Sequence, residues 1–367
     1  MIVKSLEVSN YRNYENMSII FESGKNILYG ENAQGKTNVL EALYLSATTK
    51  SHRSSRDREM IRFGCEEAHI RTVVCKKDRD YQIDMHLRRS KAKGVAINRV
   101  PIHKAIDLFG ILNVILFSPE DLGIIKNGPA ERRRFLDFEL CQLDKIYLSD
   151  LSRYNQALQQ RNKLLKDMED RPELKETLPV WDSQLIHYGM GVIRKRREFI
   201  SNLNEVIQNI HSKITGEKEK IVIKYEPDVS ENAFSNELAF ASERDERMMQ
   251  TSVGPHRDDM IFQVDGIDIR RFGSQGQQRT AALSLKLSEI ALVEQMIHDK
   301  PVLLLDDVLS ELDGSRQNYL LNSIEDIQTV ITCTGLDEFV RNRFPMDSLF
   351  EVKEGIVKRK TELPFNQ

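Results

Sequence analysis

Cysteine is rare in this sequence of 367 residues, and long apolar segments are missing. The four cysteines stand far apart, with no Cys-x-x-Cys pair and no histidine at zinc-finger spacing. This pattern indicates neither a disulfide framework nor a structural zinc site, and it fits a reducing compartment. No stretch approaches the roughly 20 apolar residues that cross a bilayer. We therefore expect a cytoplasmic protein with no membrane segment and no membrane partner.

A strong excess of one charge is also missing, since the net charge is −3 although 30% of the residues are charged. That balance excludes a uniformly basic, histone-like DNA binder, so any contact with DNA must use a local patch. The 40% of hydrophobic residues are enough for a sizeable core. Because the chain is longer than the size at which one core usually keeps growing, we expect two structural units.

The first third of the chain has the alternation of short strands. Apolar residues alternate with polar ones over residues 2–8 and 17–21, and a third run covers 25–29 before Gly30. A helix is predicted from Thr37. Further strand-like runs predict an antiparallel extension of this lobe, at residues 69–75, 81–87, 95–100 and 113–117.

The middle of the chain changes to a helical period. Glycine and proline are sparse over residues 130–214, where apolar residues recur at three- and four-residue steps. Arg171-Pro172 breaks this region, so the second helix can turn back antiparallel against the first. The pair is either a protruding arm or a helical core subdomain. Beyond it we predict a strand at 221–225, a polar helix at 231–249, and buried strands at 301–305 and 329–333.

A glycine-rich loop supplies the first chemical motif. Residues 30–37 match G-x-x-x-x-G-K-[ST] at every fixed position, after a predicted strand and before a predicted helix. In such loops backbone N–H groups surround a phosphate, the lysine neutralises β and γ oxygens, and the threonine hydroxyl binds Mg²⁺. The motif therefore predicts ATP and Mg²⁺ as ligands. The predicted nucleotide-binding residues in and beside this loop are Gly30, Glu31, Asn32, Ala33, Gln34, Gly35, Lys36, Thr37 and Asn38.

Two carboxylates follow an apolar run much later in the chain, at Asp306 and Asp307. A carboxylate at the end of a buried strand suits Mg²⁺, which keeps several of its waters. We therefore assign the metal to Thr37 and Asp306. Asp307 is then placed to orient or deprotonate the attacking water.

The segment 271–279, Arg-Phe-Gly-Ser-Gln-Gly-Gln-Gln-Arg, resembles the signature loop of ABC ATPases. The resemblance implies that Ser274, Gln275 and Gly276 contact the γ-phosphate of ATP held by another subunit, with the N-terminus of a helix at 280–296 directed toward it. Residues 309–313 resemble the D-loop that lines the same interface.

Four further segments resemble the RecF family: residues 8–14, 117–122, 128–137 and 254–259. In the first of them, the resemblance implies that Arg12 reaches the nucleotide. It also implies an α/β fold, an ABC-type P-loop ATPase head with a mixed sheet and an antiparallel extension. The head would be built from residues 1–118 and 250–367, and residues 119–249 would form an inserted, mainly helical arm domain.

The same resemblance implies a weak, DNA-dependent ATPase of recombinational repair and replication restart. Two protomers would close on ATP as a homodimer bound to double-stranded and gapped or single-stranded DNA, and slow hydrolysis would release it. Partners of the RecO and RecR type, recombinase loading and the SOS response follow from the family. The alternatives are a transporter ATPase subunit and an SMC-type structural head. The Arg12 segment weighs against the first, and an insertion far shorter than an SMC coiled coil weighs against the second.

The sequence departs from the general ABC pattern at three places. Asp307 stands where most ABC ATPases carry glutamate, which predicts slow hydrolysis. No histidine follows the strand at 329–333, so a threonine hydroxyl of 332–334 could substitute, and Glu120 or Asp121 could take the place of the Q-loop glutamine. Candidate contacts for DNA phosphates are the basic clusters at 50–58, 88–93 and 194–197, of which the first is favoured because it leaves the phosphate-loop helix.

Overall fold

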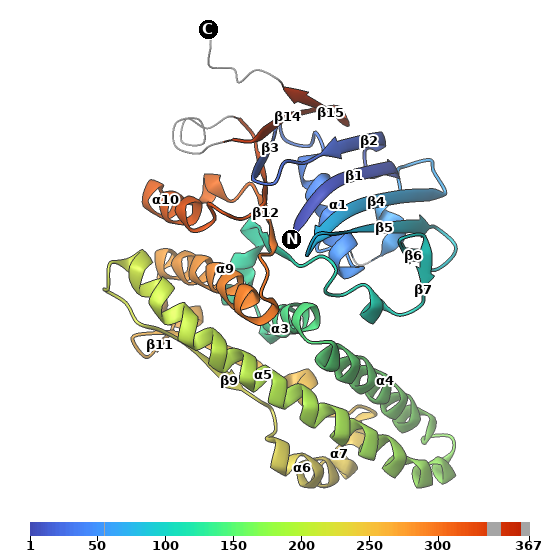
Figure 1. Cartoon of the computed structure of the whole chain (residues 1–367). Helices are drawn as coiled ribbons and strands as arrows, with labels where there is room; N and C mark the ends of the chain where they lie inside the picture. Colours follow the sequence, from blue (N-terminus) through green and yellow to red (C-terminus); the bar gives the residue numbers. More distant parts are fainter. Residues whose placement is uncertain (55, 336–345, 361–367) are drawn as a thin grey trace. The chain divides into compact units, whose positions relative to one another are not determined.

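The computed structural model describes residues 1–54, 56–335 and 346–360, and it divides into two compact units. We call the unit formed by Met1–Pro119 and Glu289–Gln367 the head, and the unit formed by Glu120–Ser288 the arm. Figure 1 shows the elements of both. Among the described residues, no helix combines the length and the apolar character needed to cross a bilayer.

The first sheet of the head is antiparallel, with strand order β2-β1-β4-β5-β6-β7. Along β4 and β5 buried and exposed residues alternate, which is the pattern of a sheet with one face on the core and the other in water. The strands confirm the predicted runs at 2–8, 17–21, 69–75 and 81–87. The predicted run at 95–100 is instead two strands, because Asn98 and Arg99 have φ of +51° and +68° and form a hairpin turn between them. The strand bounds are β1 Ile2–Tyr11, β2 Tyr14–Ile20, β4 Glu67–Lys76, β5 Arg79–Arg88, β6 Gly94–Ile97 and β7 Val100–Ile102.

The second sheet of the head has the order β15-β14-β3-β13-β12-β8 and is parallel except for β15. We expected residues 113–117 in the antiparallel extension, and that expectation is wrong. This strand, β8, pairs in parallel with β12, because all four of its residues are buried and only a sheet covered on both faces accommodates such a run. The bounds are β3 Lys25–Tyr29, β8 Val114–Phe117, β12 Val302–Asp306, β13 Thr329–Cys333, β14 Ser348–Lys353 and β15 Ile356–Lys360.

Helix α1 (Lys36–Thr48) contacts strands of both sheets, and its residues from Val39 to Thr48 are nearly all buried. A helix that is buried all round is fixed in place by packing on each side. The loop that precedes α1 is therefore held on a rigid support. Among the described residues, the other helices of the head are α10 Gly314–Ser323, the part of α9 (Gln275–Ile297) from Glu289 on, and the 3-10 helices η1 Asp57–Met60, η2 Ala105–Asp107 and η7 Leu309–Glu311.

The arm consists of helices around a three-stranded antiparallel sheet of order β11-β10-β9. Helices α4 and α5 pack against each other on either side of the break at Arg171-Pro172, as predicted. The helical bounds are α2 Leu122–Lys126, α3 Pro129–Leu143, α4 Lys145–Asp167, α5 Leu178–Thr215, α6 Phe234–Phe240, α7 Ser242–Met248, α8 Ile269–Phe272 and α9 Gln275–Ile297. The strands are β9 Ile221–Glu226, β10 Asp259–Val264 and β11 Ile267–Asp268, and the 3-10 helices are η3 Pro119–Asp121, η4 Pro172–Thr177, η5 Glu231–Ala233 and η6 Pro255–Arg257.

Residues 231–249 do not form the single helix that we expected. They form η5, α6 and α7, and the break lets Asp245 of α7 point into the arm and accept a hydrogen bond from Arg161 at 2.7 Å. Residues 250–288 lie in the arm, whereas we placed the return to the head at residue 250. The reason is that β10 pairs with β9 and so belongs to the small sheet of the arm.

Three buried arginines hold the arm together, and each pairs with aspartate. Arg132 bonds Asp259 through two nitrogens. The guanidinium of Arg161 bonds Asp182 and Asp245, and that of Arg196 bonds Asp137 and Asp258. A buried charge is tolerated only when it is paired and hydrogen-bonded in this way, so removing one partner would be strongly destabilising.

Candidate nucleotide-binding site

The predicted phosphate loop lies between β3 and α1, and two of its glycines are required by close contacts. A Cβ at Gly30 would lie 2.2 Å from the carbonyl oxygen of Val352. Gly35 has φ of +116°, and a Cβ there would lie 2.7 Å from Nδ2 of Asn13. Because side chains cannot occupy either position, glycine lets the loop backbone curve closely before the helix begins.

Lys36 is the first residue of α1, and its side chain contacts the loop. Its Nζ donates hydrogen bonds to the carbonyl oxygens of Gly30 at 2.6 Å and Glu31 at 2.8 Å. Burial lowers the pKa of Lys36, and the carboxylate of Asp307 opposes that shift. The loop carbonyls hold the ammonium group of Lys36 beside the loop, where it can pair with the negative charge of a phosphate. These residues therefore fit a bound phosphate.

The metal-binding residues that we predicted lie together in the head. The Thr37 hydroxyl donates to Oδ1 of Asp306 at 2.9 Å, and the same oxygen accepts from the Thr332 hydroxyl at 2.8 Å. Three oxygen atoms from α1, β12 and β13 therefore meet at one point. Hydroxyl and carboxylate oxygens suit a hard cation, so this set fits Mg²⁺.

Asp307, the predicted base, has an unusual backbone. Its φ of +54° lies in the left-handed region that few residues other than glycine adopt. The hydroxyl of Thr332 accepts its backbone N–H at 3.0 Å and so helps hold this conformation. Burial raises the pKa of Asp307, and the nearby Lys36 ammonium opposes the shift. Strain of this kind at a charged residue is typical of functional sites.

The signature segment lies in the arm, where Ser274, Gln275 and Gly276 are exposed around the start of α9. Ser274 and Gln277 form a reciprocal pair: Ser274 N–H donates to Oε1 of Gln277 at 3.0 Å, and Oγ of Ser274 accepts the Gln277 N–H at 3.1 Å. This is a capping box, which fixes the first turn of a helix. The Gln277 amide also donates to Oε1 of Glu219 at 3.0 Å, so a third side chain positions the loop.

Comparisons with known proteins agree with one another. Residues 2–357 match the family described as RecF/RecN/SMC N terminal domain. A protein of Agathobacter rectalis named DNA replication and repair protein RecF is 66% identical over 358 residues, 98% of this chain and 99% of that protein. The protein of the same name from Lachnoclostridium phytofermentans is 58% identical over 98% of this chain and all of its own length. The chain belongs to the RecF family.

Solved structures extend the likeness to the fold. A structure of the recombination mediator protein RecF with ATP, in the RecFOR pathway, is 34% identical, with a TM-score of 0.91 over 98% of this chain and 97% of that one. An Smc head domain from Pyrococcus furiosus shares the fold at 16% identity, with a TM-score of 0.57 over 98% of this chain and 95% of that one. This RecF-family chain therefore has an ABC-type ATPase head with a mixed sheet, an antiparallel extension and an inserted helical arm.

Arg12, which we expected at the nucleotide, is held in the head by three partners. Its guanidinium bonds both carboxylate oxygens of Glu41, at 2.8 and 2.6 Å, the Ser54 hydroxyl at 2.6 Å and the carbonyl of Glu59 at 2.8 Å. Burial alone would raise the pKa of Glu41, but hydrogen bonds from Arg12 and Ser51 lower it below its ordinary value. Sequence reasoning missed Glu41, although a carboxylate beside the apolar positions of a predicted helix was a usable signal.

A second set of contacts joins the phosphate loop to the basic cluster at 50–58. The Asn13 amide donates to the carbonyl of Gln34 at 2.8 Å, and Asn38 donates to Oδ1 of Asn13 at 2.8 Å. Oδ1 of Asn38 in turn accepts from Arg53 at 3.2 Å. These side-chain hydrogen bonds therefore connect the phosphate loop to the start of α1 and to the basic cluster.

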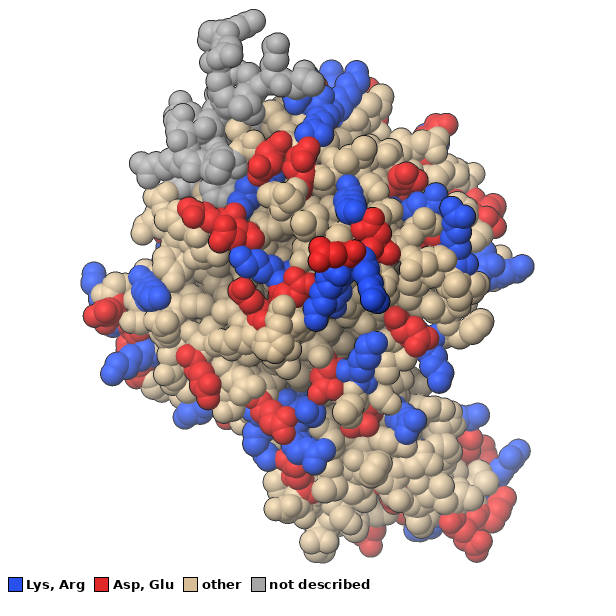
Figure 2. All heavy atoms as spheres, in the orientation of Figure 1, with Lys and Arg blue, Asp and Glu red and all other residues tan. Residues whose placement is uncertain are grey.

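The three basic clusters differ in how much of their charge is available. Lys50, Arg53, Arg56 and Arg58 of the first cluster are exposed. In the third cluster Arg196 is only 2% exposed and bonded to two aspartates, which contradicts its proposed contact with phosphates. Figure 2 shows Lys and Arg interspersed with Asp and Glu over the visible face, so no large field of one sign covers it.

Two of the substitutes for missing ABC residues can now be located. The Thr332 hydroxyl is already shared by Asp306 and the Asp307 N–H, so it positions these residues and is not available to sense a γ-phosphate. Thr334 is exposed and remains the candidate for that role. Glu120 and Asp121 lie in η3, directly after β8, and their part in the site stays a prediction.

Proposed function

We propose that this protein binds ATP with Mg²⁺ and uses it as a switch on DNA in recombinational repair and replication restart. The observation that carries the proposal is the meeting of Thr37, Asp306 and Thr332 beside the Lys36 loop, in a chain that also has an ABC signature. The relatives are named DNA replication and repair proteins, and a solved relative carries ATP. Both findings support ATP as the ligand and repair as the setting.

In the proposed mechanism Lys36 and the loop N–H groups bind the β- and γ-phosphates. Thr37 and Asp306 would hold Mg²⁺, which when bound neutralises charge on the phosphate oxygens. Asp307 orients the attacking water and accepts its proton, and its raised pKa suits a general base. Because its side chain is one methylene shorter than glutamate, its reach to water is smaller, so we expect weak, switch-like hydrolysis.

The signature residues are the basis for proposing a dimer. Ser274, Gln275 and Gly276 are exposed at the N-terminus of a helix of 23 residues, where an anion is stabilised by free N–H groups and the helix dipole. We infer that they grip the γ-phosphate of ATP bound to a second copy of the chain, which makes an isologous homodimer. Hydrolysis removes the group that both sides hold, so the difference in affinity between ATP and ADP is the free energy available for opening.

The DNA-binding part of the proposal rests on the cluster at 50–58. Its exposed cations suit backbone recognition of double-stranded and gapped or single-stranded DNA. Because Arg53 bonds Asn38 beside the phosphate loop, the nucleotide can influence this cluster directly. The RecFOR setting of the solved relatives supports mediators of the RecO and RecR type as partners. Recombinase loading at gaps and the SOS response are the proposed outputs.

Light scattering after gel filtration tests the dimer. We expect wild-type protein to dimerise with ATP and Mg²⁺, and Ser274→Arg to stay monomeric because the larger side chain occupies the place of the γ-phosphate. Ser235→Arg, at an exposed serine of α6, is the matched control and should dimerise normally. A normal ATP-dependent dimer of Ser274→Arg would contradict the proposal. Hydrolysis that neither single- nor double-stranded DNA stimulates would favour a transporter ATPase instead.

A further inference from the structure

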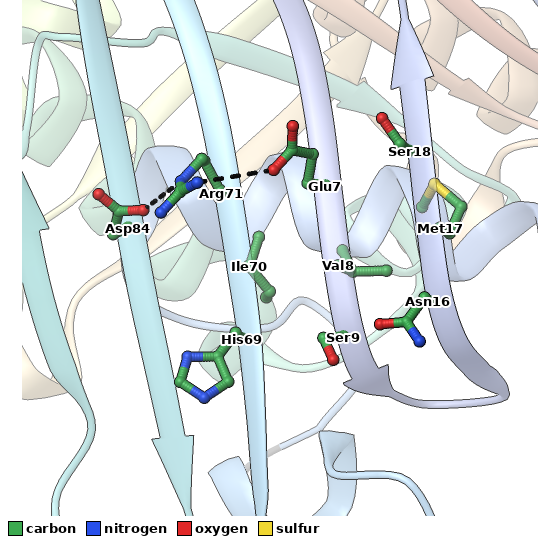
Figure 3. Close-up of a pocket in the computed structure, with 10 residues that line it drawn as sticks. All are labelled: Glu7, Val8, Ser9, Asn16, Met17, Ser18, His69, Ile70, Arg71 and Asp84. Carbon is green, nitrogen blue, oxygen red and sulfur yellow. Dashed lines mark hydrogen bonds and ion pairs between the residues drawn. The ribbon is translucent and has the colours of Figure 1, made fainter.

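The solvent-facing side of the antiparallel sheet carries a cluster unrelated to the nucleotide site. Residues that pair directly across strands lie on one face, and here such a row runs Asn16, Ser9, His69, His86 and Gly94. In Figure 3, His69 of β4 lines a pocket together with Ser9 and Asn16. Two imidazoles therefore stand side by side in the middle of the row.

The two imidazoles converge with a carboxylate. The rings of His69 and His86 are stacked, with centroids 4.1 Å apart and planes at 21°. Nε2 of His86 lies 2.7 Å from Oε2 of Glu67, which is two residues from His69 on the same face of β4. One ligand atom from each of the three residues lies within 4.8 Å of the others. Because the ligands of a zinc ion lie about 2.0 to 2.2 Å from it, the three side chains must rotate to bring these atoms closer together.

The surroundings leave the cluster free to accept a cation. Arg71, the nearest cation on β4, is neutralised by Asp84 at 2.7 Å and by Glu7 at 3.7 Å, as Figure 3 shows. Arg88, opposite Glu67, turns its Nη2 to the carbonyl oxygen of Ala92 at 2.9 Å. Nη2 of Arg88 also lies 3.7 Å from the position that a Cβ of Gly94 would take, so this guanidinium stands beside Gly94 next to His86. Glu67 and His69 are exposed, so water can complete a coordination sphere from the solvent side.

We propose that Glu67, His69 and His86 bind a divalent transition-metal ion of the Zn²⁺ type and so cross-link β4 to β5. Two imidazoles and one carboxylate are a ligand set that Zn²⁺ accepts with water in the fourth position. Mg²⁺ and Ca²⁺ prefer oxygen ligands, so this site differs from the one at Thr37 and Asp306. A bound ion fixes neighbouring strands directly, and it stabilises the folded head because the unfolded chain does not present the site.

Calorimetry on the full chain without nucleotide tests the site. Zn²⁺ added in the presence of excess Mg²⁺ should bind with a stoichiometry of one. We expect His69→Ala and His86→Ala each to weaken this binding by at least about tenfold, since losing even a supporting residue of a metal site costs about 10- to 100-fold. His69→Gln keeps a polar side chain on the strand and should lose binding to the same degree. His103→Ala and His187→Ala, at exposed histidines elsewhere, should bind as wild type does.

Co²⁺ provides an independent readout, because its visible spectrum reports nitrogen and oxygen ligands directly. The histidine variants should lose that spectrum while circular dichroism shows them folded. Cys65→Ser/Cys75→Ser protein should retain it, because these half-buried thiols are not ligands in the proposal. Zn²⁺ binding that survives in folded His69→Ala and His86→Ala, or that disappears with the cysteines, would overturn the site.

Discussion

Thr332→Val removes one hydroxyl without changing the shape of the side chain, and it tests how the two carboxylates are held. The hydroxyl donates to Asp306 at 2.8 Å and accepts from Asp307 N–H at 3.0 Å, and the residue is 1% exposed. A bond to a charged acceptor contributes about 1.5 to 3 kcal/mol and a neutral one about 0.5 to 1.5, so we expect unfolding to become easier by about 2 to 4 kcal/mol. If half of that loss is felt at the site, hydrolysis falls by roughly 10-fold.

Urea unfolding followed by circular dichroism measures the first effect, and phosphate release at saturating ATP and DNA measures the second. The hydrolysis assay is run well below the unfolding transition, so that loss of folded protein does not contribute. Thr332→Ser keeps the hydroxyl and should retain most of both properties. Valine protein that hydrolyses ATP at the wild-type rate would refute our reasoning that Thr332 positions Asp306 and Asp307.

Substitutions at three residues and a change of pH test other parts of the site. Arg12→Gln should lower the free energy of unfolding by about 3 to 5 kcal/mol in a urea titration, because it leaves the fully buried Glu41 without its cation; equal stability of the two proteins would show that Glu41 does not depend on this guanidinium. Asp307→Glu should raise the rate of phosphate release by extending the base, and Asp307→Asn should abolish it while dimers persist. Since burial raises the pKa of Asp307, and the ionised form is the base, wild-type hydrolysis should fall on acidification at a pH above the ordinary range of aspartate. Glu219→Ala should weaken ATP-dependent dimerisation in sedimentation several-fold, with Glu219→Gln closer to wild type; unchanged dimerisation would remove Glu219 from the signature loop.

The head was predictable where a local motif and its strand or helix agree. The phosphate loop lies between β3 and α1 as predicted, since the glycine spacing and the flanking apolar runs point to the same structure. The strand at 113–117 was assigned to the wrong sheet because the sequence of an apolar run does not show which strand it pairs with. Its partner β12 lies almost 190 residues away in the sequence, and such pairing is decided by burial on both faces.

The site was less predictable where partners are distant in the chain and carry no motif. The capping box of Ser274 and Gln277 has a sequence signature, so the start of α9 could have been placed there and not at Thr280. Glu219 precedes β9 in a stretch rich in charge, and nothing in its surroundings distinguishes it from a solvated residue. The prediction that Arg196 contacts DNA phosphates was wrong for a different reason. A run of basic residues on an amphipathic helix places one of them on the buried face.

The position of Arg12 bears on how a nucleotide could affect the basic cluster. Its guanidinium joins Glu41 of α1, Ser54 of the cluster and the backbone carbonyl of Glu59, the residue after the cluster. Any movement of Arg12 toward a nucleotide would leave the buried Glu41 carboxylate without its bidentate cation, at a cost of several kcal/mol. The same movement would release Ser54. Contact of Arg12 with a nucleotide and release of the basic cluster are therefore linked through one side chain. The free energy of ATP binding must exceed the cost of separating Arg12 from Glu41 before the cluster moves.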